Sequence, residues 1–278
     1  MLRIEPLDHE AAAVRERLCA FLAPHESYGL FILGNLNTRF PGTHLYAAVE
    51  GERWLGVAGY YDGPRSLIPF TLDVAVATAL AEQVLAVHPT PEWLLGAAFA
   101  AEPALAVLVQ RGFTVLNHPR HVFMEAPLGQ TLALPRSPHE EHVRLMRPGD
   151  GESVARLLRV LRDPTNQASV TLEESARAEA NPLRVVLEVD GRIVATAGTN
   201  GIGIRAFQIL GVVTDPAYRR RGFARAVCTA LIRRLHEQGA RHSVLFTDVT
   251  NLAAQRCYAE IGFAYTGNFT VAKLARQS

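Results

Sequence analysis

Six consecutive residues in the last third of the sequence have the types and the order expected of a phosphate-binding turn. They read Arg-Arg-Arg-Gly-Phe-Ala and directly precede a stretch that favours a helix. The first N–H groups of a helix have no partner within it, and the peptide dipoles add partial positive charge. The arginines add full charge, and the glycine lets an anion approach the backbone. We therefore predict a pyrophosphate site formed by Arg219, Arg220, Arg221, Gly222, Phe223 and Ala224. A basic helix start that simply faces water is the alternative.

The strand expected before this turn, within residues 205–213, stops abruptly. Val212, Val213 and Thr214 are followed by Asp215-Pro216, and proline has no N–H with which to continue strand pairing. The last backbone groups of the strand are then free to pair with an amide-rich ligand. Coenzyme A has an amide-rich pantetheine arm and a pyrophosphate, so it suits the strand end and the turn together.

Two side chains near the C-terminus could contact the same ligand. Asn251 stands at an expected helix start, and Tyr258 follows seven residues later, two helical turns on, so the two share a face. A phenol in this position can donate a proton to a departing thiolate. The alternative is an aromatic ring that only packs against a sheet.

The sequence does not identify a general base. Four polar side chains lie near expected strand ends: Glu188, Gln208, His242 and Asp248. All of them except Gln208 can titrate. Each fits a structural role better than a catalytic one.

The hydrophobic pattern predicts the elements that position these residues. A long helix after Gly222 has one apolar face, and it is followed by a short strand at 244–246 and a second helix that ends at Gly262-Phe263. Strand, turn, helix and strand form a βαβ unit. Upstream, Asp190-Gly191 predicts a tight hairpin, preceded by helices at about 150–161 and 172–179.

The first part of the chain repeats features of the second. Residues 49–52 resemble residues 189–192, and Arg111-Gly112-Phe113 resembles Ile261-Gly262-Phe263. A helix is expected at 74–87, a strand at 94–99 and a short helix at 103–110. Two copies of one architecture are therefore expected, with a linker at 128–141, where prolines and charges replace large apolar residues.

The first copy is expected to be degenerate. Aligning Gly112-Phe113 with Gly262-Phe263 places Leu108 where Tyr258 stands and Ala101 where Asn251 stands. No turn like that at 219–224 precedes the helix at 74–87. The first copy is therefore expected to lack a coenzyme site.

Composition limits the class of protein. The 278 residues are 49% hydrophobic and 20% charged, as in a globular domain, and their net charge of +1 gives no general attraction to nucleic acid. No apolar run approaches the roughly 20 residues that span a bilayer, and the N-terminus has no apolar signal core. The three cysteines have unrelated spacings, and no zinc cluster is evident. A cytoplasmic protein without metal, membrane or nucleic-acid partner is expected.

Together the motifs resemble the GCN5-related N-acetyltransferase (GNAT) superfamily, in particular its FR47-like members. The three matching segments, in order, are 212–216, 219–224 and 247–263. The resemblance implies an α/β fold with a mixed sheet, of the kind also classed as α+β. It has tandem GNAT-like domains, each a central twisted, mostly antiparallel sheet flanked by helices. We assign residues 1–127 to a degenerate N-terminal domain, 128–141 to a linker and 142–278 to the acetyltransferase domain.

The resemblance also implies roles for the residues. Backbone groups of Val212, Val213 and Thr214 would hold pantetheine, and an amide there would polarise the thioester. Asn251 would contact the coenzyme arm and Tyr258 would act as general acid. Many relatives have Ser-Asn shortly before this tyrosine, whereas this chain has Ala254-Gln255, which puts a coenzyme contact from that turn in doubt.

The expected function is transfer of an acetyl group from the cosubstrate acetyl-CoA to a primary amine. The acceptor is a small molecule or a peptide of unassigned identity, and a homodimer is left open. A non-catalytic sensor that binds acyl-CoA is the alternative. A third hypothesis treats the arginines of 219–234 as a nucleic-acid patch, and the near-neutral net charge counts against it.

Overall fold

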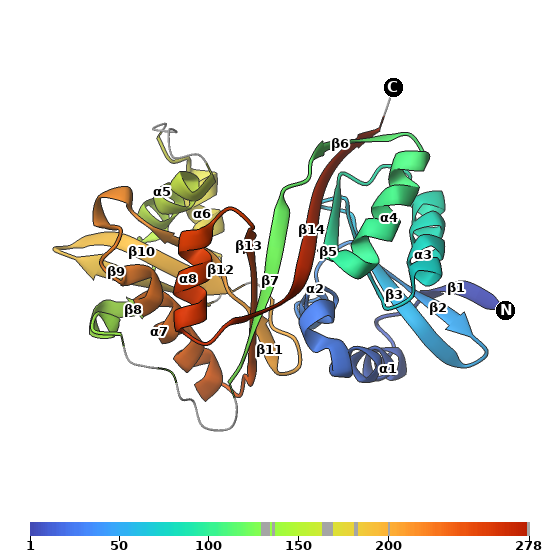
Figure 1. The fold of residues 1–278 in the computed structure, drawn as a ribbon, viewed down its shortest axis with the longest axis horizontal. Coiled ribbons are helices and arrows are strands. Elements are labelled where there is room, and N and C mark those ends of the chain that lie inside the picture. Colours follow the sequence, from blue (N-terminus) through green and yellow to red (C-terminus); the bar gives the residue numbers. More distant parts are fainter. Residues whose placement is uncertain (129–133, 135–136, 163–168, 181–182, 200, 277–278) are drawn as a thin grey trace. The chain divides into compact units, whose positions relative to one another are not determined.

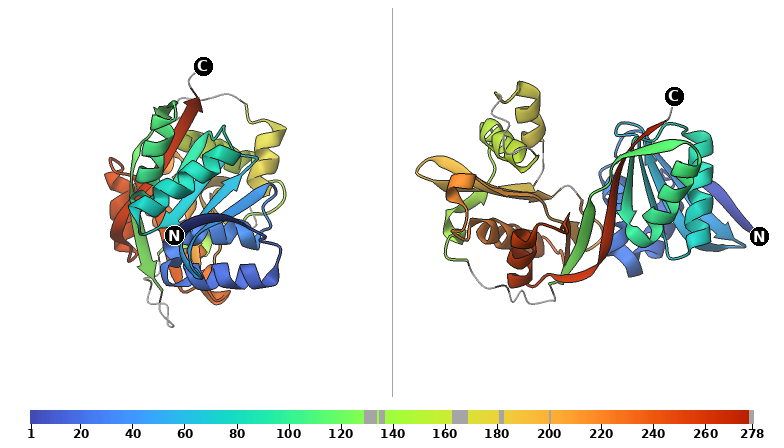
Figure 2. Two further views of the ribbon diagram at one scale, coloured as in Figure 1. Left: turned by 90° about the vertical axis from the view of Figure 1, so that its right-hand side faces the viewer. Right: turned by 45° about the horizontal axis from the view of Figure 1, so that its top comes forward.

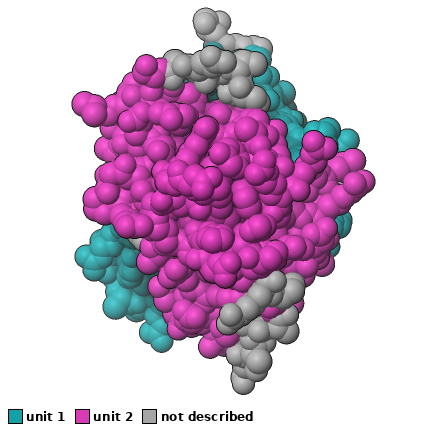
Figure 3. All heavy atoms as spheres, turned by 90° about the vertical axis from the view of Figure 1, so that its left-hand side faces the viewer, with its two compact units in different colours: residues 1–124, 246–251, 265–278 teal, residues 125–245, 252–264 magenta. Residues whose placement is uncertain are grey.

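We analysed a computed structural model of the chain, which describes residues 1–128, 134, 137–162, 169–180, 183–199 and 201–276. The chain divides into two compact units (Figures 1 and 3). Unit 1 comprises residues 1–124, 246–251 and 265–278, and unit 2 comprises residues 125–245 and 252–264. No helix within the described ranges combines the length and the apolar character needed to cross a bilayer.

Unit 1 is built on a sheet in the order β1-β2-β3-β4-β5-β14. Its elements are β1 (Leu2–Leu7), α1 (Ala12–Leu22), α2 (Glu26–Asn37), β2 (Thr43–Glu50), β3 (Arg53–Tyr61), β4 (Ser66–Thr71), α3 (Val74–Val87), β5 (Trp93–Ala97), α4 (Ala98–Gln110), β6 (Phe113–Asn117) and β14 (Ala264–Arg276). Strand β7 (Arg120–Pro127) begins in this unit and ends in unit 2.

Both faces of the unit 1 sheet are buried. Along β2, Leu45 and Ala47 join a core with α1 and α2, whereas Tyr46 and Ala48 join a core with α3 and α4. Successive side chains of a strand point to opposite faces, so the helices before β2 and the helices after β4 cover opposite faces of the sheet. This explains why β2 reads as a continuous apolar run.

Unit 2 repeats this element order. It contains β8 (Val143–Leu145), α5 (Gly151–Arg162), α6 (Leu172–Glu179), β9 (Leu183–Val189), β10 (Arg192–Thr199), β11 (Ala206–Gln208), β12 (Leu210–Thr214), α7 (Phe223–Glu237), α8 (Leu252–Glu260) and the first part of β13 (His242–Asp248). Helices α5 and α6 lie on one side of the sheet β12-β10-β9-β8, and α7 lies on the other (Figure 2).

Local chemistry accounts for two elements that the sequence predicted. Asp190 and Gly191 both have positive φ, of 49° and 75°, as the tight turn between β9 and β10 requires. Helix α6 begins with a capping box, in which Thr171 and Glu174 satisfy each other's backbone N–H groups. The repeated order of strands and helices confirms the predicted tandem architecture.

Three features differ from the expectations. The strand expected at 205–213 is divided into β11 and β12. The strand expected at 94–99 ends at Ala97, and α4 starts there, so the helix is longer than predicted. Ala101 consequently lies inside α4, whereas Asn251 precedes α8, and the two positions are not equivalent.

The compact units are not continuous in sequence, unlike the predicted domains 1–127 and 142–278. Strand β14 belongs to unit 1, because Phe269–Lys273 pair antiparallel with Trp93–Ala97 of β5. The same strand also pairs with β6. Of the linker predicted at 128–141, residues 129–133 and 135–136 lie outside the described residues.

Candidate active site

The strand before the arginine-rich turn changes partner part-way along its length. Strand β11 pairs in parallel with β13, from Ala206 opposite His242 to Gln208 opposite Val244. The last backbone bond of this ladder runs from the N–H of Ile209 to the carbonyl of Val244, at 2.9 Å. Strand β12 then pairs antiparallel with β10 in a different sheet. Among the residues that the structure describes, β12 is the last strand of that sheet, so one of its edges has no neighbouring strand.

A β-bulge lies at the start of β12. Thr196 of β10 is opposite Val213, but Gly198 is opposite Leu210, so β12 has one more residue than its partner between these pairs. Gly211 provides the conformation, with a φ of +59°. A bulge interrupts the ladder and re-aims backbone groups, and here it does so at the open edge predicted to hold pantetheine at 212–214.

The turn after β12 leaves the start of α7 open. Gly222, at a φ of +79°, is the N-cap, and no side chain caps the helix. A Cβ built at Gly222 would have the His139 ring, at 3.9 Å, as its nearest contact. The N–H groups of the first turn are therefore not covered by a side chain of the helix start, as an anion site requires.

Two of the predicted arginines are held close to this turn. The guanidinium of Arg221 lies 5.1 Å from the centre of the Tyr218 ring. Nε of Arg219 donates to the carbonyl of Thr214 at 3.4 Å. On the other side of Tyr218, Arg192 lies 5.7 Å from the ring and forms an ion pair with Asp215 at 2.6 Å. Tyr218 and Arg192 were not predicted from the sequence, although Tyr218 stands three residues before Arg221.

Tyr258 is buried on α8, with 8% of its surface exposed. Its ring lies 6.0 Å from that of Phe263. Burial raises the pKa of its hydroxyl well above the ordinary value, and the nearby thiols of Cys228 and Cys257 raise it further. The phenol is therefore protonated at neutral pH, which suits a proton donor and not a base.

Asn251 lies directly before α8 and is exposed. Its N–H donates to the carbonyl of Asp248 at 2.9 Å. The carboxylate of Asp248 accepts bonds from the N–H and the hydroxyl of Thr250, which lower its pKa. Asp248 therefore acts as a turn-former, and its lowered pKa makes it a poorer base.

The other base candidates have structural partners or unsuitable positions. Arg144 binds the carboxylate of Glu188, at 2.7 Å. His242 contacts Glu125 at 2.7 Å, at the end of the β11–β13 ladder away from the point where the strands separate. Gln208 lies at that point and its Oε1 is buried without a hydrogen-bond partner, but an amide does not titrate. The geometry assigns none of the four as a base.

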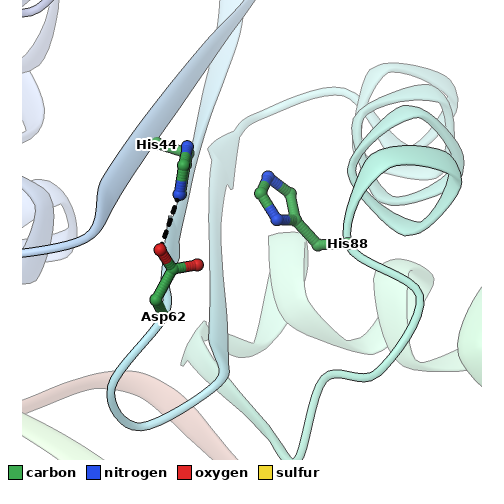
Figure 4. A group of neighbouring side chains, drawn as sticks. All are labelled: His44, Asp62 and His88. Atoms are coloured by element: carbon green, nitrogen blue, oxygen red, sulfur yellow. Dashed lines mark hydrogen bonds and ion pairs between the residues drawn. The ribbon is translucent and has the colours of Figure 1, made fainter.

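One group of side chains in unit 1 has metal-ligating types in close proximity: His44, Asp62 and His88 (Figure 4). These residues come from β2, the end of β3 and the end of α3, and not from β12, α7 or α8.

The comparison with protein families decides the class of the second unit. Residues 154–263 match the model of the acetyltransferase (GNAT) family. This segment is a GNAT-family domain. The match includes β12, the turn at 219–224, α7 and Tyr258, and the activity of the family is acyl transfer. Residues 154–263 therefore form an acyltransferase domain of the GNAT type. No curated protein matches the sequence.

Solved structures show the same fold over nearly the whole chain. A Drosophila protein has a TM-score of 0.74 at 14% identity, over 99% of both chains. A structure described as a tandem GNAT protein from the clavulanic acid biosynthesis pathway has a TM-score of 0.58 at 14% identity, over 99% of this chain and 98% of that one. A GNAT-family acetyltransferase from Novosphingobium aromaticivorans has a TM-score of 0.58 at 18% identity, over 91% and 98%.

Proposed function

We propose that unit 2 transfers an acetyl group from acetyl-CoA to the primary amine of a small-molecule or peptide acceptor. One observation carries this proposal: strand β12 has an open, bulged edge, and the uncapped start of helix α7 follows it closely in the chain. Gly222, the N-cap of α7, stands only eight residues after Thr214, the end of β12. A single ligand with an amide-rich arm and a pyrophosphate makes use of both features.

The donor would lie along β12. Backbone groups of Val212, Val213 and Thr214 would pair with the amides of pantetheine, as an added strand does. The pyrophosphate would accept hydrogen bonds from the N–H groups at 219–224, with the charge of the arginines in addition. Asn251, exposed before α8, would contact the coenzyme arm.

The chemistry would be a direct attack. The lone pair of the neutral amine forms a bond with the thioester carbonyl carbon, and an N–H of the bulged strand stabilises the negative oxygen. The carbon–sulfur bond then breaks, and Tyr258 donates its proton to the thiolate as it leaves. The nitrogen releases its proton to water, and proton uptake from water restores the phenol. The products are the amide and free CoA.

Titration of the protein with CoA and acetyl-CoA in a calorimeter tests the donor site. Gly222→Glu places bulk and a negative charge at the start of α7, and we expect it to weaken binding ~100-fold or more, about 2.7 kcal/mol. Gly239→Glu is the matched control, because Gly239 also has positive φ and open space but follows the opposite end of the same helix. Equal binding by the two variants would disprove the assignment.

A non-catalytic sensor of acyl-CoA would show the same binding. The presence of a phenol at Tyr258 favours the enzyme, and turnover with an amine acceptor separates the two functions.

A further inference from the structure

Arg184 of β9 is a buried arginine. Only 4% of its surface is exposed, although it lies near the start of β9. Its guanidinium donates to the Thr196 hydroxyl at 3.3 Å, and its Nε is buried with no hydrogen-bond partner among the residues that the structure describes. No carboxylate among the described residues pairs with it, and burial alone lowers its pKa to about 10. A buried charge without a counter-ion destabilises the fold.

The guanidinium lies beneath the bulge of β12. A Cβ at Gly211 would come within 3.4 Å of both of its terminal nitrogens, and a Cβ at Gly198 within 3.0 Å of one. Two glycines thus leave the space that the guanidinium occupies. Leu158 of α5 is the other close neighbour of Gly211, so the charge lies on the side of the sheet covered by α5.

This face of the sheet is opposite to α7. Arg184 shares a strand face with Val186, which packs against α5 and α6. The phosphate site predicted at the start of α7 has its own arginines and lies on the other side of the sheet, so the pyrophosphate does not account for Arg184. The bulge beside it is where the thioester would lie, and the acceptor must reach that carbon.

We propose that Arg184 binds a carboxylate of the acceptor, which makes the acceptor an amino acid or another amine that bears a carboxylate. This inference rests on the proposed function. A guanidinium presents paired N–H groups that match the two oxygens of a carboxylate. Such a contact would compensate the buried charge and hold the amine a short distance away, at the bulged strand.

The test compares the twenty amino acids with their carboxamides. Binding to the CoA-saturated protein is followed by thermal shift, and turnover with acetyl-CoA by release of the CoA thiol. At least one amino acid should raise the melting temperature and react at least 10-fold faster, in kcat/KM, than its carboxamide. Arg184→Gln should abolish this preference, whereas Arg156→Gln, an exposed arginine on α5, should keep it.

The outcomes separate this inference from the proposed function. Failure of the native protein to bind CoA would contradict the proposed function. CoA binding without any stabilisation or preference by a carboxylate would overturn the role of Arg184 alone. The melting temperature of Arg184→Gln without acceptor is a further readout. We expect it to rise, because an uncompensated charge is removed, and a fall would indicate a purely structural role.

An independent observation concerns His44, Asp62 and His88 in unit 1. One ligand atom of each lies within 4.8 Å of the others, and Nε2 of His44 is 2.9 Å from a carboxylate oxygen of Asp62 (Figure 4). His44 is on β2, Asp62 directly follows β3, and His88 ends α3. The β2–β3 ladder holds His44 opposite Tyr60, so the group is positioned by regular elements.

The surroundings of His88 fix the orientation of its ring. Its ring stacks on Tyr60 at 4.1 Å, and its Nε2 lies 2.9 Å from the hydroxyl of Tyr46. A hydrogen bond at one ring nitrogen orients an imidazole that binds a metal through the other nitrogen.

We propose that this group binds a divalent transition metal such as Zn²⁺. Two imidazoles and one carboxylate form a common ligand set, with water in the fourth position. Ligand atoms around zinc lie roughly 3.3–3.6 Å apart, given bonds of about 2.0–2.2 Å. Small rotations of partly exposed side chains would therefore close the group on the ion.

Titration of the metal-free full chain with Zn²⁺ in a calorimeter tests this site. One ion per chain should bind, with the affinity at least 10-fold weaker in His88→Ala and in Asp62→Asn. His118→Ala is the control, because His118 is also a partly exposed histidine of unit 1 paired with an acid. Absent binding, or equal loss in His118→Ala, would overturn the proposal.

Discussion

The two units begin corresponding helices in opposite ways. In unit 1, Asp73 caps α3, and its carboxylate accepts bonds from the N–H groups of Ala75 and Val76 at 2.7 and 3.2 Å. In unit 2, Gly222 precedes α7 and no side chain caps it. A carboxylate thus occupies in unit 1 the position that an external anion is expected to occupy in unit 2. In unit 1 the side-chain cap therefore occupies N–H groups that remain uncapped at the start of α7.

Helix α4 of unit 1 and helix α8 of unit 2 also differ at one corresponding position. Helices α4 and α8 are each followed by a glycine with positive φ, Gly112 and Gly262, so the chain leaves both helices in the same way. Four residues before these glycines stand Leu108, which is fully buried, and Tyr258. Unit 1 keeps the packing role of this position, and unit 2 adds a hydroxyl to it.

The largest expected effect tests this added hydroxyl. Tyr258→Phe keeps the ring and removes the proton donor, so turnover should fall by ~100-fold or more while CoA affinity stays unchanged. Steady-state kinetics and calorimetry measure the two quantities. Tyr265→Phe is the control, since this tyrosine is exposed on β14. Unchanged turnover in Tyr258→Phe would remove the phenol from the mechanism and, with it, this difference between the units.

Local patterns allowed much of both units to be predicted from the sequence. The Asp190-Gly191 hairpin and the limits of α6 depend on residues close in sequence, so their signals were sufficient. The partner change after Ile209 was missed, because both strand segments are apolar and only Gly211 marks the break. The place of β14 was missed because its pairing with β5 is a long-range contact.

The candidate site shows the same limit. The turn at 219–224 and Tyr258 could be found because they are short, ordered motifs. Arg184 could not, because a single arginine near the start of a strand resembles a surface residue, and only its burial makes it unusual. Asp73 was also not predicted as a site of interest, because its importance depends on the helix that it caps.

The first strands of the two units differ in length, and this difference leads to a second prediction, with a smaller expected effect on stability. Strand β1 pairs with β2 over six residues, but β8 pairs with β9 over only three. Arg144 of β8 compensates with ion pairs to Asp150 at 2.6 Å and Glu188 at 2.7 Å. Arg144 and the N–H of Arg147 lower the pKa of Asp150. Asp150→Asn should therefore lower the free energy of unfolding by ~1–3 kcal/mol at pH 7.

The pH dependence of this loss follows from the sign of the shift. A lowered folded-state pKa adds stability above the unfolded-state pKa, about 3.9, and this stability disappears as the pH falls through the folded value. Urea unfolding should thus show the stabilities of the native protein and Asp150→Asn converging as the pH falls from the unfolded-state pKa through the lower folded-state pKa. Asp190→Asn is the control, because asparagine tolerates its positive φ. A constant difference between native protein and variant would exclude the ionic explanation.

The smallest expected effect is on stability and concerns Asp73, the cap of α3. Asp73→Ala removes the cap of α3 and should destabilise unit 1 by ~1 kcal/mol, measured by urea unfolding. It should not create a second CoA site, because the start of α3 lacks both the glycine and the arginines of residues 219–222. Calorimetry should therefore still give one CoA per chain. Two per chain would show that the carboxylate alone separates the units, and no loss of stability would show that it is not a cap.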